Sequence, residues 1–358
     1  MHTLTTTFEA MNFSDELIHW YFKNKRDLPW RNTTNPYIIW LSEIILQQTR
    51  VEQGLPYFNR FLEKYPDVNS FAAAGEGDIL NLWQGLGYYS RGRNMLKTAR
   101  QVVAEFGGEF PVDYEQLIHL KGIGEYTAAA ISSFSANHAK AVVDGNVFRV
   151  LARYFGISDP INSTKGKKLF QDVANDVLNK ENPGLHNQAM MEFGAMLCKP
   201  KSPDCEICPV KSGCYAYNNN AIAGLPQKLK KTKIRERFLN YIVVTNGDTI
   251  LMNKRGEKDI WANMHDLPLF ESAHRITAEQ VLSLPEFKSH FGENTLIINT
   301  YPIKKHVLTH QHLHAQFIHI DKTPIKLEQK WFHINVNNLK NIAMPKIIFI
   351  FINNLFNL

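Results

Sequence analysis

The stretch LKGIGEYTAAA, from Leu120 to Ala130, sets two glycines around one isoleucine and then continues in small residues. Gly122 and Gly124 allow a short turn between two helices, and we expect the second helix to begin near Glu125. Such a turn presents backbone N–H groups at the positive end of that helix, a combination that binds a phosphate without a basic side chain. An ordinary turn between two helices accounts for the same glycines about equally well.

The chain around this stretch has 358 residues, enough for two domains with a sizeable core. Its formal net charge of +6 favours an anionic partner only weakly. The first residues lack the charged start and apolar core of a secretory signal, and no apolar run approaches the length of a membrane span. We therefore expect a cytoplasmic protein without a membrane partner.

The character of the sequence changes after Cys214. Residues 14–200 carry apolar positions at helical spacing and predict a mainly helical region. A polar and then basic stretch at 218–236 is typical of a linker. Beyond it, apolar runs flank Asn246 and Gly247, which predicts a β-hairpin within a smaller α/β domain. Two further strands are expected at 295–303 and 306–320.

Two carboxylates are notable because of their neighbours. Glu43 lies in the apolar stretch WLSEIILQQT, where burial is expected to raise its pKa and let it hold a proton near neutral pH. A buried arginine or hydroxyl partner is the simpler explanation for Glu43 taken alone. Asp144 precedes the helix NVFRVLARYFG, where it either caps the helix or places a negative charge beside a positively charged sugar. One protonatable and one ionised carboxylate are the pair that glycosidic bond cleavage uses.

All four cysteines of the chain lie close together, in the pattern C-x6-C-x2-C-x5-C. Four thiols at short spacings in a reducing compartment indicate a metal site rather than disulfides. Four-cysteine zinc sites are common, but they favour pairs separated by two to four residues. The longer gaps suit one loop around a [4Fe–4S] cluster better. The predicted ligands are Cys198, Cys205, Cys208 and Cys214.

Three histidines alternate with other residues in the last predicted strand. On one strand, His310, His312 and His314 would lie on the same face. Such a face is either a metal site or a polar, DNA-facing surface. We favour the polar surface, because the sequence adds no carboxylate or thiol to the pattern.

Six motifs in order give the chain a family resemblance. From about Leu28 to Cys214 it resembles the adenine DNA glycosylases of the MutY family, within the helix–hairpin–helix superfamily that includes endonuclease III. The remaining residues resemble the C-terminal domain of that family more loosely. The motifs are LPWR at 28–31, WLSEIILQQTRV at 40–51, WQGLGYYSRGRN at 83–94, LKGIGEYTAAAI at 120–131, VVDGNVFRVLAR at 142–153 and the cysteine pattern.

The resemblance implies a fold class with two parts. The first, residues 1–217, is a mainly α-helical glycosylase domain with a helix–hairpin–helix at about 113–131 and a [4Fe–4S] cluster loop at 198–214. A basic linker, 218–236, joins it to an α/β Nudix-like domain, 237–358, that recognises 8-oxoguanine. The stretch after DLPLFE lacks the glutamate-rich helix of an active Nudix hydrolase, so no nucleotide hydrolysis is expected there.

The resemblance also implies a reaction, the hydrolysis of the N-glycosidic bond of adenine mispaired with 8-oxoguanine or guanine, after the adenine leaves the stack. Glu43 would protonate the adenine, and Asp144 would stabilise the oxocarbenium ion. Tyr126 and Asn146 would support Asp144 and the sugar. Tyr126 stands where relatives that also cut the strand carry a Schiff-base lysine, so a monofunctional enzyme is expected.

Other residues match family positions that contact DNA. Gln48 and Tyr88 match residues that wedge into the duplex beside the orphan base, and Arg31 matches a residue that lines the adenine pocket. The remaining DNA-contacting positions are Thr49, Gly122, Gly124, Leu308, Thr309 and His310.

The C-terminal part departs from the family in two places. Leu308, Thr309 and His310 replace a phenylalanine–serine–histidine that touches the oxidised base, and the aromatic ring is lost. Asn263 and His265 stand where glycine and tryptophan are usual. Both departures bear on the mode and strength of 8-oxoguanine recognition.

Two other functions remain open from the sequence. An endonuclease III-like bifunctional glycosylase/AP lyase would remove oxidised pyrimidines and cut the strand, but Tyr126 and the C-terminal domain argue against it. A non-catalytic lesion-binding protein would need neither Glu43 nor Asp144. The expected partner is double-stranded DNA containing A:8-oxoguanine or A:G mispairs, bound by a monomer associated with the nucleoid.

Overall fold

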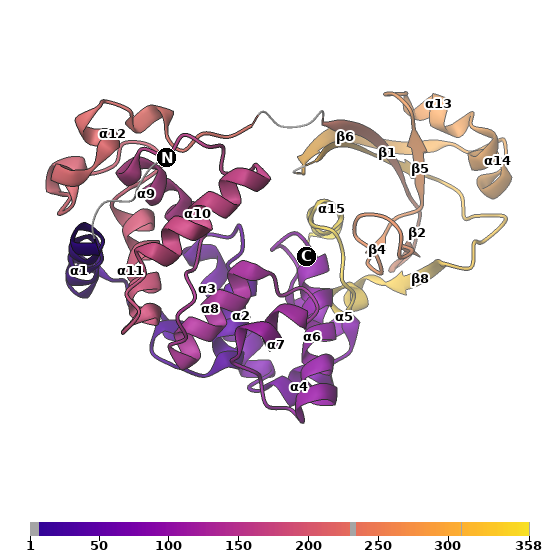
Figure 1. Ribbon diagram of the computed structural model, residues 1–358. Helices are drawn as coiled ribbons and strands as arrows, with labels where there is room; N and C mark the ends of the chain where they lie inside the picture. Colours follow the sequence, from indigo (N-terminus) through magenta and orange to yellow (C-terminus); the bar gives the residue numbers. More distant parts are fainter. Residues whose placement is uncertain (1–6, 230–233, 309, 358) are drawn as a thin grey trace. The chain divides into compact units, whose positions relative to one another are not determined.

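The chain folds as two compact units in a computed structural model that describes residues 7–229, 234–308 and 310–357 (Figure 1). One unit combines Met1–Ala73 with Asn94–Lys230, and the other combines Ala74–Arg93 with Lys231–Leu358. The second unit therefore takes a short segment from the middle of the region in which the sequence predicts helices. The part of the predicted linker at 230–233 lies outside the described residues.

The first unit is built from helices, as the sequence predicts, because apolar residues at helical spacing give each long helix one face to bury. The first residues of α6 belong to the second unit. The elements are α1 (Thr7–Asn24), η1 (Pro29–Arg31), α2 (Pro36–Ile45), α3 (Val51–Lys64), α4 (Val68–Ala72), α6 (Ser90–Phe106), α7 (Tyr114–His119), α8 (Glu125–Ala136), α9 (Gly145–Phe155), α10 (Thr164–Asp176), α11 (Pro183–Met196), η2 (Cys205–Ile207), η3 (Lys211–Gly213), α12 (Tyr215–Asn218) and η4 (Ile222–Gly224).

Several helix ends lie where the sequence places them. α8 begins at Glu125, and α9 is followed by Gly156, whose φ of 70° favours glycine. α2 has Pro36 in its first turn but ends at Ile45, earlier than its apolar pattern suggests. The chain turns there because Gln48 adopts a left-handed φ of 56°.

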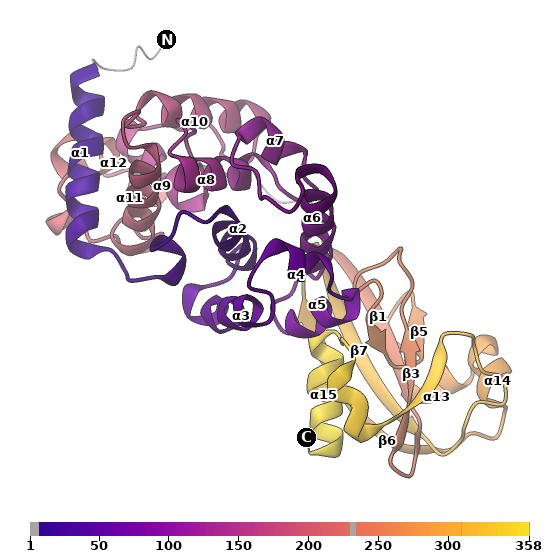
Figure 2. The same ribbon diagram turned by 90° about the horizontal axis from the view of Figure 1, so that it is seen from below.

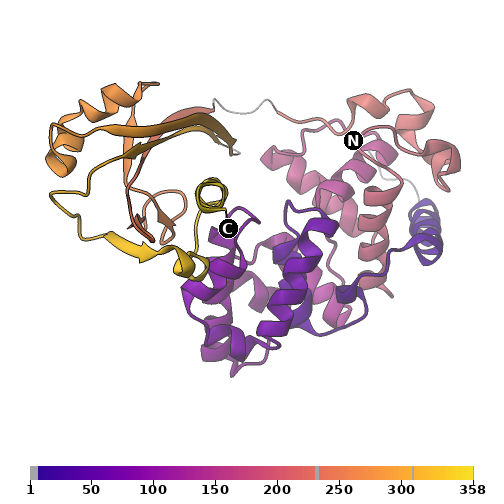
Figure 3. The same ribbon diagram turned by 180° about the vertical axis from the view of Figure 1, so that it is seen from behind.

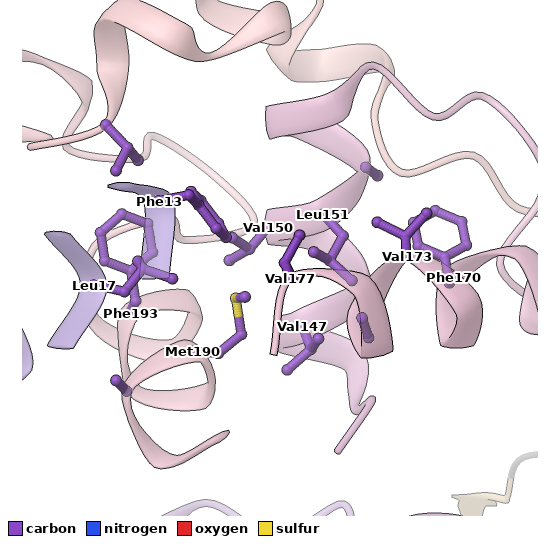
Figure 4. Close-up of a cluster of buried hydrophobic side chains, with 14 of the residues drawn as sticks. Phe13, Leu17, Val147, Val150, Leu151, Phe170, Val173, Val177, Met190 and Phe193 are labelled. Carbon is purple, nitrogen blue, oxygen red and sulfur yellow. The ribbon is translucent and has the colours of Figure 1, made fainter. Parts of the chain in front are cut away.

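Helices from distant parts of the chain share one apolar core. α1 lies alongside α11, as Figure 2 shows, and α9 packs against the same helix. Figure 4 shows the side chains that meet between them. This core fixes the start of α9, where Asp144 stands. Its buried members include Phe13, Leu17, Val147, Val150, Leu151, Phe170, Val173, Val177, Met190 and Phe193.

The second unit mixes strands and helices, which agrees with the predicted α/β domain. Within the described ranges, every helix is too short or too polar to span a lipid bilayer. The elements of this unit, besides the start of α6, are α5 (Glu76–Leu82), β1 (Arg235–Val243), β2 (Thr245–Asn246), β3 (Thr249–Lys254), β4 (His265–Asp266), β5 (Leu269–Ser272), α13 (Ala278–Leu282), α14 (Pro285–Phe291), β6 (Ile297–Val307), β7 (Gln311–Ile320), β8 (Trp331–Asn335), η5 (Val336–Asn341) and α15 (Lys346–Phe356).

The larger sheet has the strand order β5-β1-β7-β6, with β1 and β7 parallel and the other pairs antiparallel. Neighbouring residues of a strand point to opposite faces. Phe317 of β7 stacks on Phe351 of α15, with ring centroids 3.8 Å apart, whereas Ile318 joins the apolar cluster of α13 and α14. Helices therefore cover both faces of this sheet, and Figure 3 shows α15 on one of them. A smaller sheet has the order β2-β3-β4, and β8 also pairs with β3.

One strand prediction is confirmed and another is wrong. The predicted hairpin forms between β2 and β3, but its turn residues are Gly247, with a φ of 55°, and Asp248, because Asn246 ends β2 and pairs with Thr249. The stretch 306–320 is not one strand, because β6 ends at Val307 and β7 begins at Gln311. The stretch contains no glycine, proline, asparagine or aspartate to mark a turn, so the sequence did not reveal the reversal.

Gly156 provides a test of the packing at the end of α9. A Cβ added there would lie 2.6 Å from Cγ of Tyr215, and the φ of 70° is unfavourable for other residues. Gly156→Ala should lower the free energy of unfolding by about 1–3 kcal/mol. Gly145→Ala is the matched control in the same helix, because a Cβ there meets nothing within 4 Å. Urea unfolding measures both, and an unchanged midpoint for Gly156→Ala would contradict this account.

Candidate active site

Glu43 is a buried carboxylate on α2, the helix that packs against α8. Its side chain is only 8 % exposed, and the hydroxyl of Tyr126 on α8 donates a 2.6 Å hydrogen bond to Glu43 Oε2. Burial raises the pKa of Glu43 to about 7, although the Tyr126 hydrogen bond and the charge of Arg31 act in the opposite direction. A carboxyl group with this pKa exchanges a proton at neutral pH.

Asp144 caps the start of α9, as an aspartate at this position commonly does. Its Oδ1 accepts hydrogen bonds of 2.8 Å from the backbone N–H groups of Asn146 and Val147, and its Oδ2 accepts one of 2.8 Å from Asn146 Nδ2. Arg149 Nη2 in turn donates to Asn146 Oδ1 at 2.8 Å. Burial raises the pKa of Asp144, while these hydrogen bonds and the charge of Arg149 favour the ionised form.

The side chains of Glu43, Tyr126 and Asp144 share one electrostatic environment. The charge of Asp144 contributes to the raised pKa of Glu43. Burial raises the pKa of Tyr126 well above its usual value, and the charges of Glu43 and Asp144 add to the rise. The structure therefore brings together a protonatable carboxyl, a neutral phenol and a capped carboxylate from three separate segments.

A second buried carboxylate, Glu192 on α11, was not singled out by the sequence. The guanidinium of Arg26 donates two hydrogen bonds to it, of 2.9 and 2.6 Å, and the Arg26 backbone N–H donates another of 2.9 Å. Arg31 Nη2 donates a further one of 2.7 Å. Burial raises the pKa of Glu192, but the two guanidinium groups outweigh burial and bring it to about 2. Its position in the apolar stretch AMMEFGAM was the available signal, the same one that identified Glu43. Arg31 is thus held between Glu192 and the Tyr21 ring, 5.6 Å from the ring centroid.

Gln48 and Tyr88, one in each unit, both adopt a backbone conformation that side chains rarely adopt. Their φ values are 56° and 48°, and both side chains are exposed, Tyr88 by 47 %. Such a conformation costs about 1–3 kcal/mol and persists only where the surroundings hold it, often at ligand contacts. Thr49, next to Gln48, donates a 3.3 Å hydrogen bond to the carbonyl of Gln47.

The turn between α7 and α8 has the geometry that the sequence predicts. Gly122 has a φ of 80°, and a Cβ there would lie 2.8 Å from the Cβ of Asn94. Packing does not require glycine at position 124, since a Cβ on Gly124 would meet nothing within 4 Å. Within the described ranges, no side chain caps the first turn of α8. Uncapped N–H groups beside open space are the arrangement that receives a phosphate oxygen.

The four cysteine thiols line one pocket beneath α9 and α11, together with apolar side chains such as Val150 and Phe193. Burial and neighbouring thiols raise the pKa values of Cys205, Cys208 and Cys214. Arg153 Nη1 donates a 3.5 Å hydrogen bond to the sulfur of Cys198. Thiolates are soft metal ligands, and the Arg153 guanidinium would offset part of the negative charge of four thiolates around a metal centre. The set comprises Cys198, Cys205, Cys208 and Cys214.

The histidines near the end of the chain do acquire a carboxylate partner. Because β1 and β7 pair in parallel, Glu236 lies beside His312, and its two oxygens lie 2.7 Å from His312 Nδ1 and 2.6 Å from His314 Nε2. The sequence did not show this, since the partners are on strands far apart in the chain. Still, in the part of the chain that the structure describes, no three His, Cys, Asp or Glu side chains are arranged to hold a single metal ion. This applies to His312, His314 and Glu236, and also to the four thiols, which share a pocket without forming such a group.

His310 is separate from that pair of histidines. It is exposed in the turn before β7, where its carbonyl accepts a 3.2 Å hydrogen bond from the N–H of Arg235, and Leu308 is half-buried at the other side of the turn. Thr309 lies outside the described residues.

Comparison with known proteins matches both parts of the chain. Residues 41–175 match the HhH-GPD superfamily base excision DNA repair protein family, and residues 240–354 match the NUDIX domain family. The adenine DNA glycosylase of Buchnera aphidicola subsp. Acyrthosiphon pisum (strain APS) is 33 % identical over 339 residues, which cover 93 % of this chain and 95 % of that one. The chain belongs to the adenine DNA glycosylase family.

Other relatives agree. The adenine DNA glycosylase of Mus musculus is 41 % identical over 248 residues, which cover 67 % of this chain and 48 % of the mouse protein. The structure of a thermostable thymine-DNA glycosylase superposes with a TM-score of 0.56 at 28 % identity, covering 60 % of this chain and 100 % of its own. A non-covalent endonuclease III–DNA complex has a TM-score of 0.52 at 22 % identity, covering 61 % of this chain and 99 % of its own, and shows the shared fold. This chain is a base-excision DNA glycosylase, and DNA is its partner.

The hydrogen bond between Tyr126 and Glu43 in the glycosylase has a measurable consequence. It stabilises the ionised form of Glu43, so Tyr126→Phe should move the pKa of Glu43 above its value of about 7. Carbon-13 NMR of the Glu43 carboxyl, titrated from pH 5 to 9, measures the shift. Tyr114→Phe on the neighbouring helix α7 is the control and should leave the midpoint in place. A midpoint that stays fixed or falls in Tyr126→Phe would show that the bond does not act on Glu43.

Proposed function

We propose that this glycosylase hydrolyses the N-glycosidic bond of adenine mispaired with 8-oxoguanine or guanine. The observation that carries the proposal is the state of Glu43, a buried carboxyl with a pKa of about 7 that is hydrogen-bonded to Tyr126 and lies within the field of Asp144. The names of the relatives in Buchnera and Mus musculus support adenine as the base.

In this proposal, Glu43 donates its proton to N7 of the flipped adenine. The electrons of the glycosidic bond leave with the neutralised base, and a positively charged sugar remains. Asp144 stabilises that charge, because its hydrogen bonds from the start of α9 favour the carboxylate. Glu43, now ionised, accepts a proton from the water that attacks the sugar. Asn146 keeps Asp144 oriented through its 2.8 Å side-chain bond.

Tyr126 supports a monofunctional reaction. A strand-cutting relative uses a lysine amine here to attack the sugar, and a neutral phenol cannot form a Schiff base. The pKa of Tyr126, raised well above its usual value, keeps the phenol protonated and able to donate to Glu43. The tyrosine therefore tunes the acid instead of serving as a nucleophile.

The DNA contacts follow from the same residues. Arg31, fixed by Glu192, lines the pocket for the flipped adenine. Gln48 and Tyr88 enter the duplex, and Thr49 contacts the DNA next to Gln48. An exposed side chain on a strained turn is well placed to take the position of a base in the DNA stack. Gly122 and Gly124 let a phosphate approach the start of α8. The turn with Leu308, Thr309 and His310 meets 8-oxoguanine without the aromatic ring of its relatives.

The cysteine pocket is proposed to hold a [4Fe–4S] cluster, with a structural and DNA-facing role. Four thiols in an apolar setting beside Arg153 fit a cluster that carries net negative charge. The proposed hydrolysis uses Glu43 and Asp144 and moves protons only. It therefore needs no electron from the cluster. The enzyme is proposed to act as a monomer.

Glu43→Gln tests the acid directly. Gln cannot donate the proton, so single-turnover excision of adenine opposite 8-oxoguanine should fall by about 10²–10⁴-fold. Binding to the mispaired duplex should stay within about threefold, since Gln keeps the shape of the side chain. Glu63→Gln, an exposed residue of α3, is the control and should excise at the parental rate. Parental excision by Glu43→Gln would overturn the assignment.

One assay separates the proposed function from its alternatives. The purified protein is incubated with duplexes containing A opposite 8-oxoguanine and with duplexes containing thymine glycol, each with and without hot alkali. Cleavage at the adenine that requires alkali supports the proposed function. Cleavage at thymine glycol without alkali would instead indicate an endonuclease III-like lyase, and binding with neither would indicate a lesion-binding protein.

Elemental analysis tests the cofactor. Anaerobically purified protein should contain about four iron and four sulfide per chain, as expected for the cluster type. The Cys208→Ala variant should lose most of the iron. The control variant Val210→Ser, which keeps all four cysteines, should retain it. One zinc per chain with no sulfide would overturn the assignment.

A further inference from the structure

The turn that carries Tyr88, residues 83–89, is held tightly by its own contacts. We call it the wedge turn. Trp83 Nε1 donates a 2.9 Å hydrogen bond to the carbonyl of Gly87, and the N–H of Leu86 donates to the carbonyl of Trp83 at 3.1 Å. Gly85 and Gly87 have φ values of 100° and 76°, which let the chain reverse within a few residues. Tyr88 follows these glycines with a left-handed φ of 48° and an exposed ring.

The wedge turn belongs to the same compact unit as the C-terminal residues, although it lies within the matched glycosylase region. Hydrogen bonds on both sides of the turn join it to residues 261–263 and 340–344, which we call the platform. Figures 1 and 2 show α5, which leads into the turn, beside the segment that leads into α15. The bonds are Asn263 Nδ2 to Glu76 Oε1 (2.9 Å), Asn81 Nδ2 to the Lys340 carbonyl (2.9 Å), Arg93 Nη1 to the Ala262 carbonyl (2.9 Å) and Tyr89 Oη to the Met344 carbonyl (3.3 Å).

The two halves of the platform are joined to each other and to the smaller sheet. The N–H of His265 donates a 2.8 Å hydrogen bond to the carbonyl of Ala343, and His265 itself pairs with Lys254 of β3. The N–H of Met264 donates to the carbonyl of Trp261 at 3.1 Å. The position of the wedge turn is therefore tied to the backbone of the Nudix-like sheet.

One of the four contacts is made by the wedge turn itself, and a second is made by a platform residue that departs from the family. The hydroxyl of Tyr89 accepts a 3.2 Å hydrogen bond from the N–H of Gly85 while it donates to Met344, so one group links the turn to the platform. Asn263 has a φ of 61° at a position where the family usually has glycine. Asparagine tolerates this conformation, and its amide adds the bond to Glu76 that glycine cannot make.

We propose that the C-terminal unit positions Tyr88 through these contacts, with Tyr89 and Asn263 as positioning residues. The strained backbone at Tyr88 would relax if the platform released the turn, and fewer molecules would present the wedge. Affinity for the mispair then falls in proportion to the fraction that presents it. The Nudix-like unit thus positions Tyr88 for insertion into the duplex, in addition to recognising the lesion. The inference rests on the proposed function, because it takes Tyr88 as the wedge.

A double-mutant cycle tests the proposal. Tyr89→Phe removes one hydroxyl, and Asn263→Gly removes one amide without adding strain. In the non-excising Glu43→Gln background, the two changes together should weaken binding to an A:8-oxoguanine duplex by about 3- to 10-fold. They should also reduce the fluorescence of 2-aminopurine placed at the adenine position. In a Tyr88→Ala background, the same changes should weaken binding by less than twofold, because the wedge that they position is already absent.

Controls separate positioning from folding and from the proposed function. Tyr301→Phe removes a hydroxyl elsewhere in the unit and should bind like the parent. Equal losses with and without Tyr88 would overturn the positioning role, as would parental affinity in the variant that combines Tyr89→Phe with Asn263→Gly. If Asn263→Gly does not fold, Tyr89→Phe alone runs the same cycle. A parent protein that does not excise adenine opposite 8-oxoguanine would overturn the proposed function instead.

Discussion

The hydrogen bond from Tyr126 to Glu43 joins α8 to α2 at a point where the carboxyl is shut off from water, and the site depends on it. It is possible because α8 presents a face of small residues, which lets other segments approach its backbone. Ala128, Ala129 and Ala130 are buried, and Gly184 of α11 packs against the carbonyl of Ser133. The small residues after Tyr126 therefore serve close packing, and the tyrosine contributes a large polar group at that contact.

Glu43 and Glu192 show how two buried glutamates acquire different protonation states. Both are buried, and burial raises the pKa of each. Glu192 has two guanidinium partners that bring its pKa to about 2, whereas Glu43 has one neutral hydroxyl and a neighbouring carboxylate, so its pKa stays near 7. The number and charge of the partners, and not burial alone, decide which glutamate is a fixed anion and which one exchanges a proton. Arg31 bonds to the first and acts on the second, which couples the two.

Local signals in the sequence predicted local features well. The start of α8 at Glu125, the end of α9 before Gly156 and the turn at Gly247 follow from backbone preferences of glycine and from helical spacing. Features that depend on distant segments were missed. Glu236 joins His312 only because β1 and β7 pair in parallel, and Glu192 finds Arg26 only when α11 packs near the N-terminal segment. The packing of 74–93 with the C-terminal residues was equally invisible, since the segment has the composition of the helical region around it.

The central claim is that Glu43 acts as an acid because its burial keeps it protonated near pH 7. The most direct measurement is the single-turnover rate of adenine excision opposite 8-oxoguanine as a function of pH, with enzyme in excess. Because the pKa is raised and the protonated form is the active one, the rate should be level in mild acid and fall about tenfold per pH unit above about pH 7. A rate that stays level from pH 6 to 9, or one that rises with pH, would contradict the account.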